Sequence, residues 1–213
     1  MQIGAIEVAG GVLDLNALIG GVNVAGAVNV TGGALNIDSS THSLTAANTI
    51  QINGDFILGE NTEADGNGDV YVSATGPQGF VMTSTNGALN IGGAVEAIQS
   101  GTYSATFAAD TITIGGNVTA SGAGKELVFG ADSSQQLTVD GAIAVDGGAS
   151  IAIVSDDANV GSINVDANSS LIASGTQITA TNGAIDVAGG LWFGGINPKP
   201  ENGLIVENTN NLP

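Results

Sequence analysis

The sequence predicts an all-β chain that folds as a single-stranded parallel β-helix, a β-solenoid with about 21 residues per turn. Residues 47–55 and 109–117 share alternating apolar positions closed by a Gly/Asn corner, and they lie 62 residues apart. Residues 141–148 and 183–190 repeat a second phrase 42 residues apart. The first separation is about three periods of 20.7 and the second about two of 21, and such a period in a strand pattern is typical of a solenoid.

Short strands separated by glycine-rich connections make up the N-terminal part of the chain. Each strand places two aliphatic side chains on one face and an Asn, Asp or Glu on the other, so one face is core and the other is in water. Connections of about three to six residues are too short for a comfortable sandwich and suit successive sides of a coil. The predicted strands are residues 6–8, 12–15, 22–24, 28–30 and 35–37.

An acidic, turn-rich stretch at residues 59–69 interrupts this pattern and predicts a loop insertion at a corner of the coil. Strands resume after it. Their number predicts about ten turns, which at a strand spacing of about 4.8 Å make a rod on the order of 50 Å long. The later predicted strands are residues 70–72, 80–82, 89–91, 112–114, 127–129, 137–139, 143–145, 151–153, 163–165, 178–180 and 185–187.

Prolines end the strand pattern near the C-terminus. Pro198 and Pro200 have no backbone N–H to donate to a sheet, and their φ angles are fixed. The solenoid is therefore predicted over residues 1–196, with a Pro/Asn-rich C-terminal segment over 197–213. Residues 204–206 of that segment fit either a last edge strand or an arm that contacts another copy.

Four phenylalanines recur at intervals close to one turn. Phe56, Phe80, Phe107 and Phe129 are 24, 27 and 22 residues apart. We expect these rings to stack inside the coil rather than to bind a ligand.

The charge balance limits the kinds of partner. The chain carries 20 Asp and Glu against two Lys and no Arg, a formal net charge of -18. Such a surface repels phosphate backbones and lacks the cations that nucleic-acid contacts require, so nucleic acid is excluded and divalent cations are favoured. The chain has no cysteine and no apolar stretch of membrane-spanning length, so neither a disulfide framework nor membrane insertion is expected.

The phrases at residues 28–37 and 85–94 resemble the low-charge Gly/Asn/Thr/Val repeats of bacterial surface adhesins. The families concerned are the passenger regions of autotransporters and the filamentous-haemagglutinin-like proteins. This resemblance of repeat style covers most of the chain. It implies a secreted, right-handed parallel β-helix at the cell surface, acting in adhesion or as a stalk.

The insertion contains a candidate calcium site. Asp65, Asn67 and Asp69 stand at i, i+2 and i+4, a spacing that points alternate side-chain oxygens at one hard cation, and Glu60 and Glu63 are close in sequence. The pattern departs from an EF-hand because a valine occupies the position of the loop glycine. The alternative is a solvated polar loop without a cation.

A polysaccharide-active enzyme is the rival class, because other parallel β-helices carry such activities. Asp156 and Asp157 are adjacent carboxylates of the kind glycosidases use, and Asp140 and Asp146 flank a nearby corner. The chain has no Arg to clamp an acidic sugar, and its one histidine, His42, has no motif around it. We therefore expect a non-enzymatic protein with no catalytic residues, in which these groups are solvated corners.

The ends of the coil are the candidate interaction sites. The first repeat is already aliphatic, and nothing amphipathic precedes it that could cover the open core. We expect copies to stack end to end into a homopolymeric surface filament, through Leu13 and Leu15 at one end and through Trp192, Phe193, Leu204 and Val206 at the other. The alternative is a monomeric adhesin fragment that binds host or matrix glycans.

Overall fold

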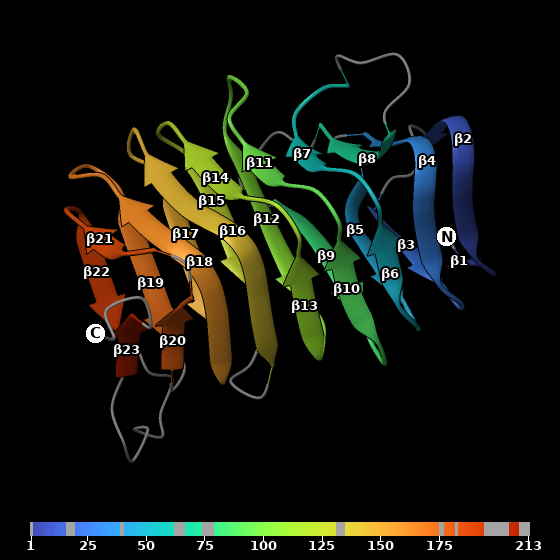
Figure 1. The fold of residues 1–213 in the computed structure, drawn as a ribbon. Helices are drawn as coiled ribbons and strands as arrows, with labels where there is room; N and C mark the ends of the chain where they lie inside the picture. Colours follow the sequence, from blue (N-terminus) through green and yellow to red (C-terminus); the bar gives the residue numbers. More distant parts are fainter. Residues whose placement is uncertain are drawn as a thin grey trace.

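The computed structural model describes residues 2–15, 20–38, 41–61, 67–73, 79–130, 135–174, 177–181, 183–193 and 205–208, and all regular structure in these ranges is β-strand (Figure 1). The same ranges contain no candidate helix for crossing a membrane. All strand pairings are parallel, and the strands stack as a β-solenoid of about 8 turns. The predicted fold class is therefore confirmed.

Three faces make up each turn of the coil, and we name them A, B and C in the order in which the chain visits them. Face A is a nine-stranded sheet. Its strands stack in the order β1 (Gln2–Ile3), β3 (Gly20–Val24), β5 (Thr41–Ala46), β9 (Phe80–Ser84), β12 (Tyr103–Ala108), β15 (Lys125–Phe129), β17 (Ser150–Val154), β19 (Ser170–Ser174) and β22 (Gly190–Phe193).

Faces B and C belong to one branched sheet, because four long strands turn the corner between them. These strands are β2 (Ile6–Leu15), β4 (Val28–Ile37), β16 (Gln136–Asp146) and β18 (Asp157–Val165). Face B also contains β6 (Ile50–Ile52), β10 (Ala88–Ile91), β13 (Thr111–Ile114), β20 (Gln177–Ala180) and β23 (Ile205–Asn208). Face C also contains β7 (Phe56–Leu58), β8 (Asn67–Val72), β11 (Val95–Ala97), β14 (Val118–Ser121) and β21 (Ile185–Val187).

The repeat length is about 22 residues, close to the predicted 21. The longest step on face A separates Leu44 from its partner Met82, and it contains the insertion. Because of this long step, the number of turns that the sequence predicts between two of its repeated phrases is wrong. Ile50 pairs with Leu89, which pairs with Ile112, so the phrases 62 residues apart are two turns apart rather than three. The predicted ten turns are likewise too many, because some strands counted from the sequence share a turn.

The insertion does not end as a loop. Its last three residues, 67–69, open strand β8, which lies between β4 and β7 on face C although β7 precedes it in the chain. On faces A and B the same two turns pair directly, as β3 with β5 and β4 with β6. One extra strand is therefore wedged into one side of the coil (Figure 1).

The core is one continuous apolar column, because alternate residues of every face point inward. The four phenylalanines are buried in it, as expected. The rings of Phe107 and Phe129 stack with centroids 5.1 Å apart, and Phe56 meets Phe107 edge to face at 4.9 Å. Aromatic contacts thus link consecutive turns through the centre of the rod.

Glycines form the corner between faces B and C. The Gly116 N–H donates to the Gly93 carbonyl at 2.8 Å, and the Gly93 N–H donates to the Gly54 carbonyl at 2.9 Å. A Cβ on Gly116 would lie 2.7 Å from the carbonyl carbon of Gly93, so the turns stack this closely only without a side chain there.

Candidate functional site

At the N-terminal end the core is partly uncovered: Ile6 and Val8 of β2 are buried, but one inward-facing leucine of this strand is not. Leu13 and Leu15 pair with the buried Leu35 and Ile37 of the next turn, so both side chains point inward. Leu15 is buried, whereas 37% of Leu13 and 45% of its neighbour Val12 remain exposed. An inward-facing leucine with this exposure marks a core that another apolar surface can cover.

At the C-terminal end Leu191 has the matching position. It pairs with the buried Leu171, so it points inward, yet 40% of its surface is exposed. The sequence analysis did not single out Leu191 or Val12. Leu191 could have been found by aligning residues 190–193 with 170–173, which gives it the same phase as Leu171.

At both ends of the coil, each of the three faces ends in a strand that is paired on one side. Within the described residues, β1 pairs only with β3, and β2 pairs only with β4. At the other end β22, β23 and β21 each have one described partner, namely β19, β20 and β18. Each end therefore offers one strand edge on each of the three faces, all in parallel orientation.

The remaining predicted end residues lie at the limit of what the structure describes. Trp192 and Phe193 are in β22, where their backbones pair with those of Ile172 and Ala173, and their side chains lie outside the described part. Val206 is in β23 and pairs with Ile178 of β20, so this segment extends face B. Leu204 lies outside the described residues.

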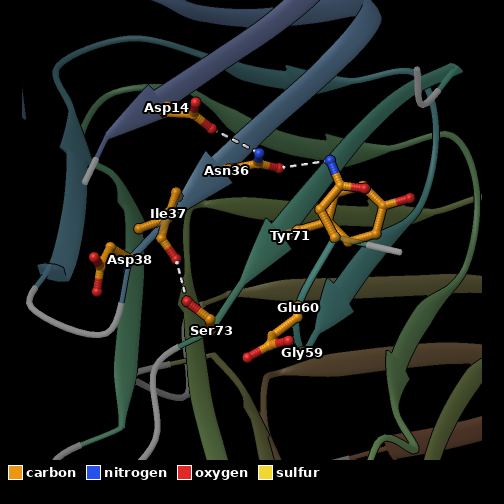
Figure 2. A pocket seen from close by; sticks show the side chains of 9 residues that line it. Asp14, Asn36, Ile37, Asp38, Gly59, Glu60, Tyr71 and Ser73 are labelled. Carbon is orange, nitrogen blue, oxygen red and sulfur yellow. Dashed lines mark hydrogen bonds between the residues drawn. The ribbon is translucent and has the colours of Figure 1, made fainter. Parts of the chain in front are cut away.

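A polar hollow of about 230 Å³ lies beside the insertion, on face C (Figure 2). A chain of hydrogen bonds crosses it from β2 to the insertion. The Asn36 amide donates to the Asp14 carboxylate at 2.7 Å, and the Asn61 amide donates to the Asn36 side-chain oxygen at 2.9 Å. The hollow is lined by Asp14, Asn36, Ile37, Asp38, Gly59, Glu60, Asn61, Tyr71 and Ser73. Hydrogen-bonding oxygen atoms thus dominate its wall.

The insertion is held by contacts to two turns. Glu60 and Gln99 exchange a pair of hydrogen bonds, from the Glu60 N–H to the Gln99 side-chain oxygen at 2.9 Å and from the Gln99 amide to the Glu60 carbonyl at 3.0 Å. Tyr71 alternates with the inward-facing Val70 and Val72 and so points outward from face C, yet it is buried; it lines the hollow (Figure 2). Its hydroxyl donates to the Asp69 carboxylate at 3.3 Å.

Two of the three predicted calcium ligands lie in a strand. Asn67 is exposed at the start of β8, and Asp69 is buried in the same strand. Each oxygen of the Asp69 carboxylate accepts a hydrogen bond, from the Asp55 N–H at 2.8 Å and from the Tyr71 hydroxyl. Asp65 and Glu63 lie outside the described residues. The calcium site stays a prediction, and it is tested by whether calcium raises the unfolding temperature of the wild type but not of an Asp65→Asn variant.

The carboxylates weighed for catalysis sit at corners and on outer faces. Asp156 is exposed at the corner before β18, and its N–H donates to the Gln135 carbonyl at 2.8 Å. Asp157 follows on face B, while Asp140 and Asp146 are exposed in β16. His42 is exposed in β5 on face A, so the structure does not bring it into a cluster with these carboxylates.

Among the described residues, two carboxyl groups have a shifted pKa. Burial, and next the negative charge of Asp55, raises the pKa of Glu96 on face C. Hydrogen bonds from the Ser169 hydroxyl, and next from the Gly147 N–H, lower the pKa of Asp166 at a corner. Glu96 therefore has a carboxylate neighbour on the adjacent strand, Asp55, whereas the hydrogen bonds to Asp166 come from its own corner and from the corner of the preceding turn.

Comparison with protein families, with curated proteins and with solved structures gives no match for this chain. The fold and the two ends of the coil therefore provide the basis for a functional assignment.

Proposed function

We propose that this chain is a non-enzymatic, extracellular structural protein whose copies stack end to end to form or extend a surface filament. The observation that carries the proposal is the match between the two ends. Leu13 at one end and Leu191 at the other are inward-facing, each more than a third exposed, and each lies next to an open strand edge. The repeat style shared with surface adhesin passengers supports the extracellular location.

Stacking continues the parallel ladder from one copy into the next. The edge of β1 meets β22 on face A, residues 6–8 of β2 meet β23 on face B, and residues 12–15 of β2 meet β21 on face C. Such a head-to-tail contact is heterologous and does not close on itself, so it produces an open filament. It also covers the exposed surfaces of Leu13 and Leu191 at every junction.

The test uses two variants that each damage one end. Leu13→Asp places a carboxylate in the N-terminal junction, and Leu191→Asp places one in the C-terminal junction. Both residues are already partly exposed at the ends, so we expect the coil itself to fold. Thr119→Asp, on the outer face of β14 in the middle of the rod, is the matched control for added charge.

We expect wild type and Thr119→Asp to form long unbranched filaments in electron microscopy and to sediment as large species. Each end variant alone should form no filament and should stay one rod long. A mixture of the two end variants should form assemblies two rods long and no longer, because only one intact junction can form between them. Filaments of Leu13→Asp, or single rods of the wild type at high concentration, would contradict end-to-end stacking.

A further inference from the structure

Face A is almost free of charge in a molecule with a net charge of -18. Of the 20 acidic residues in the sequence, Glu126 of β15 is the one found in the strands of this face. Lys125, in the same strand, is buried, with its ammonium group donating to the Gly101 carbonyl at 2.6 Å. The negative charge of the rod is therefore concentrated on its other faces, its corners and its termini.

A stripe of small and β-branched side chains runs along the outside of face A. Register aligns the members of this stripe on successive turns, and all of them are half-buried except Val81, which is 37% exposed. The stripe consists of Ser43, Val81, Thr106, Val128, Ala152 and Ile172. Beside it runs a column of Ser104, Glu126, Ser150 and Ser170, which places the one carboxylate at the margin.

The other two faces have different outer columns. On face C the column contains the carboxylates of Asp14, Glu96 and Asp186 among neutral residues. On face B the outward side chains include Glu7 and Asp157, and Asn90 and Gln51 are joined by a hydrogen bond of 3.2 Å between neighbouring turns. Face C therefore offers no uncharged stripe of this length. On face B the register aligns seven uncharged side chains, but all of them are amides or hydroxyls that need water or a hydrogen-bond partner; they are Asn29, Gln51, Asn90, Thr113, Thr138, Asn159 and Thr179.

We propose that face A is the surface through which two copies of this chain pair side by side, sheet against sheet. Two costs favour face A for this contact between copies. An approach through face C brings carboxylates of both molecules together, and like charges in an interface cost several kcal/mol. An approach through face B removes a column of amides and hydroxyls from water. Through face A the stripes meet, and Glu126 remains at the margin in contact with water. Outer faces of flat sheets pack about 10 Å apart, with their side chains interleaved.

The area of the stripe indicates how strong the pairing is. Six strands spaced about 4.8 Å apart, each contributing about five residues, give on the order of 500 Å² per copy. Two copies would bury on the order of 1,000 Å², at the lower limit for a specific interface. Single rods therefore pair weakly. In this respect the inference rests on the proposed function, because a filament repeats the contact in every subunit and multiplies the affinity.

The test adds charge to the stripe without touching the core. The double variant Thr106→Asp/Val128→Asp puts carboxylates on the outside of β12 and β15, which are neighbouring strands of face A. The matched control, Thr113→Asp/Thr138→Asp, puts the same charge on neighbouring strands of face B at positions that also point outward. Glu126→Gln removes the one carboxylate of face A. Filament width is read by electron microscopy, and the association of rods is measured by sedimentation at about 0.15 M salt and at higher salt.

We expect wild type and the face B control to form filaments two rods wide. The face A double variant should form filaments of the same length that are one rod wide, with pairing weakened by about tenfold or more. Glu126→Gln and higher salt should both strengthen pairing. Wild-type filaments of single width at high salt, a double variant that still pairs, or equal loss of pairing in the face B control would each overturn the proposal.

The outcome for face A can be separated from the outcome for end stacking. The Leu13→Asp variant removes the junctions but leaves the stripe unchanged, so its short rods should still dimerise at high concentration. That dimerisation should disappear when Thr106→Asp/Val128→Asp is added. If rods never form filaments but pair in this way, end stacking fails and the face A inference stands. If Leu13→Asp rods and wild-type filaments both remain unpaired, the face A inference fails alone.

Discussion

The carboxylate of Asp69 accepts a hydrogen bond from the backbone N–H of Asp55 at 2.8 Å. A side chain of the wedged strand β8 therefore provides the acceptor for a backbone N–H at the corner that leads into β7. Its other oxygen holds the Tyr71 hydroxyl. We expect Asp69→Ala to lower the free energy of unfolding by about 1–3 kcal/mol, because the part-buried Asp55 N–H and the buried Tyr71 hydroxyl both lose this acceptor. Asp69→Asn keeps one acceptor and should cost less. Denaturant unfolding of the three proteins measures both differences, and equal stability of the alanine variant would contradict this role.

The glycine corner predicts that two glycines respond differently to the addition of a side chain. A Cβ on Gly116 would press on the backbone of the preceding turn, whereas one on Gly10 would meet nothing within 4 Å. Gly116→Ala should therefore destabilise the protein by about 1–3 kcal/mol, as overpacking does. Gly10→Ala should be close to neutral. Thermal unfolding of the pair provides the comparison, and a neutral Gly116→Ala would mean that the turns can move apart at this corner.

Glu96 should make the stability of the wild type depend on pH in an unusual direction. Its folded pKa lies above the ordinary value of 4.5, so the ionised group destabilises the fold at pH values above the folded pKa. Glu96→Gln should raise the unfolding temperature at pH 7 by a few degrees or less, and the difference should vanish as the pH falls below about 4.5. Glu126→Gln, on face A, controls for the loss of one charge. A lower unfolding temperature for Glu96→Gln at pH 7 would be the contrary result.

Asp166 should make the stability depend on pH in the opposite direction to Glu96. Hydrogen bonds to the ionised carboxylate, among them one of 3.0 Å from the Gly147 N–H, lower its pKa below the ordinary value of 3.8. The stabilisation is present above pH 3.8 and is lost as the pH falls through the lower, folded pKa. Asp166→Asn should be less stable than wild type at pH 7, and the two should converge in strong acid. Unfolding curves at several pH values test this, and a constant difference at every pH would contradict it.

The sequence was sufficient to predict most of the strands and their stacking into a parallel coil with a period of about 21 residues, although not the number of turns. Triplets such as residues 50–52 alternate in and out, and their glycine corners leave room for the next turn, so the period can be found from local pattern alone. The ring stack of Phe107 and Phe129 followed from the same period. These features are predictable because each depends on residues within about one turn.

The position of β8 could not be predicted in the same way. Val70 and Val72 alternate with Tyr71 like any other triplet of the coil, and nothing local indicates that they pair with β4 on one side and β7 on the other. The bond from Asp55 to Asp69 that helps to hold this strand also depends on the final pairing. For the same reason two candidate calcium ligands, Asn67 and Asp69, were assigned to a loop although they are in a strand.

The wedged strand also influences the path of any assembly. Face C has one strand more than faces A and B between the same two turns, but the last described strand of face C, β21, comes before β22 and β23 in the chain. The extra strand near one end therefore offsets the one that face C lacks at the other, and each face has nine described strands. In a stack joined as proposed, every copy would add the same length on all three faces. The wedged strand would thus keep the ladder of face C continuous through each junction, and images of filaments would show a straight rather than an undulating outline.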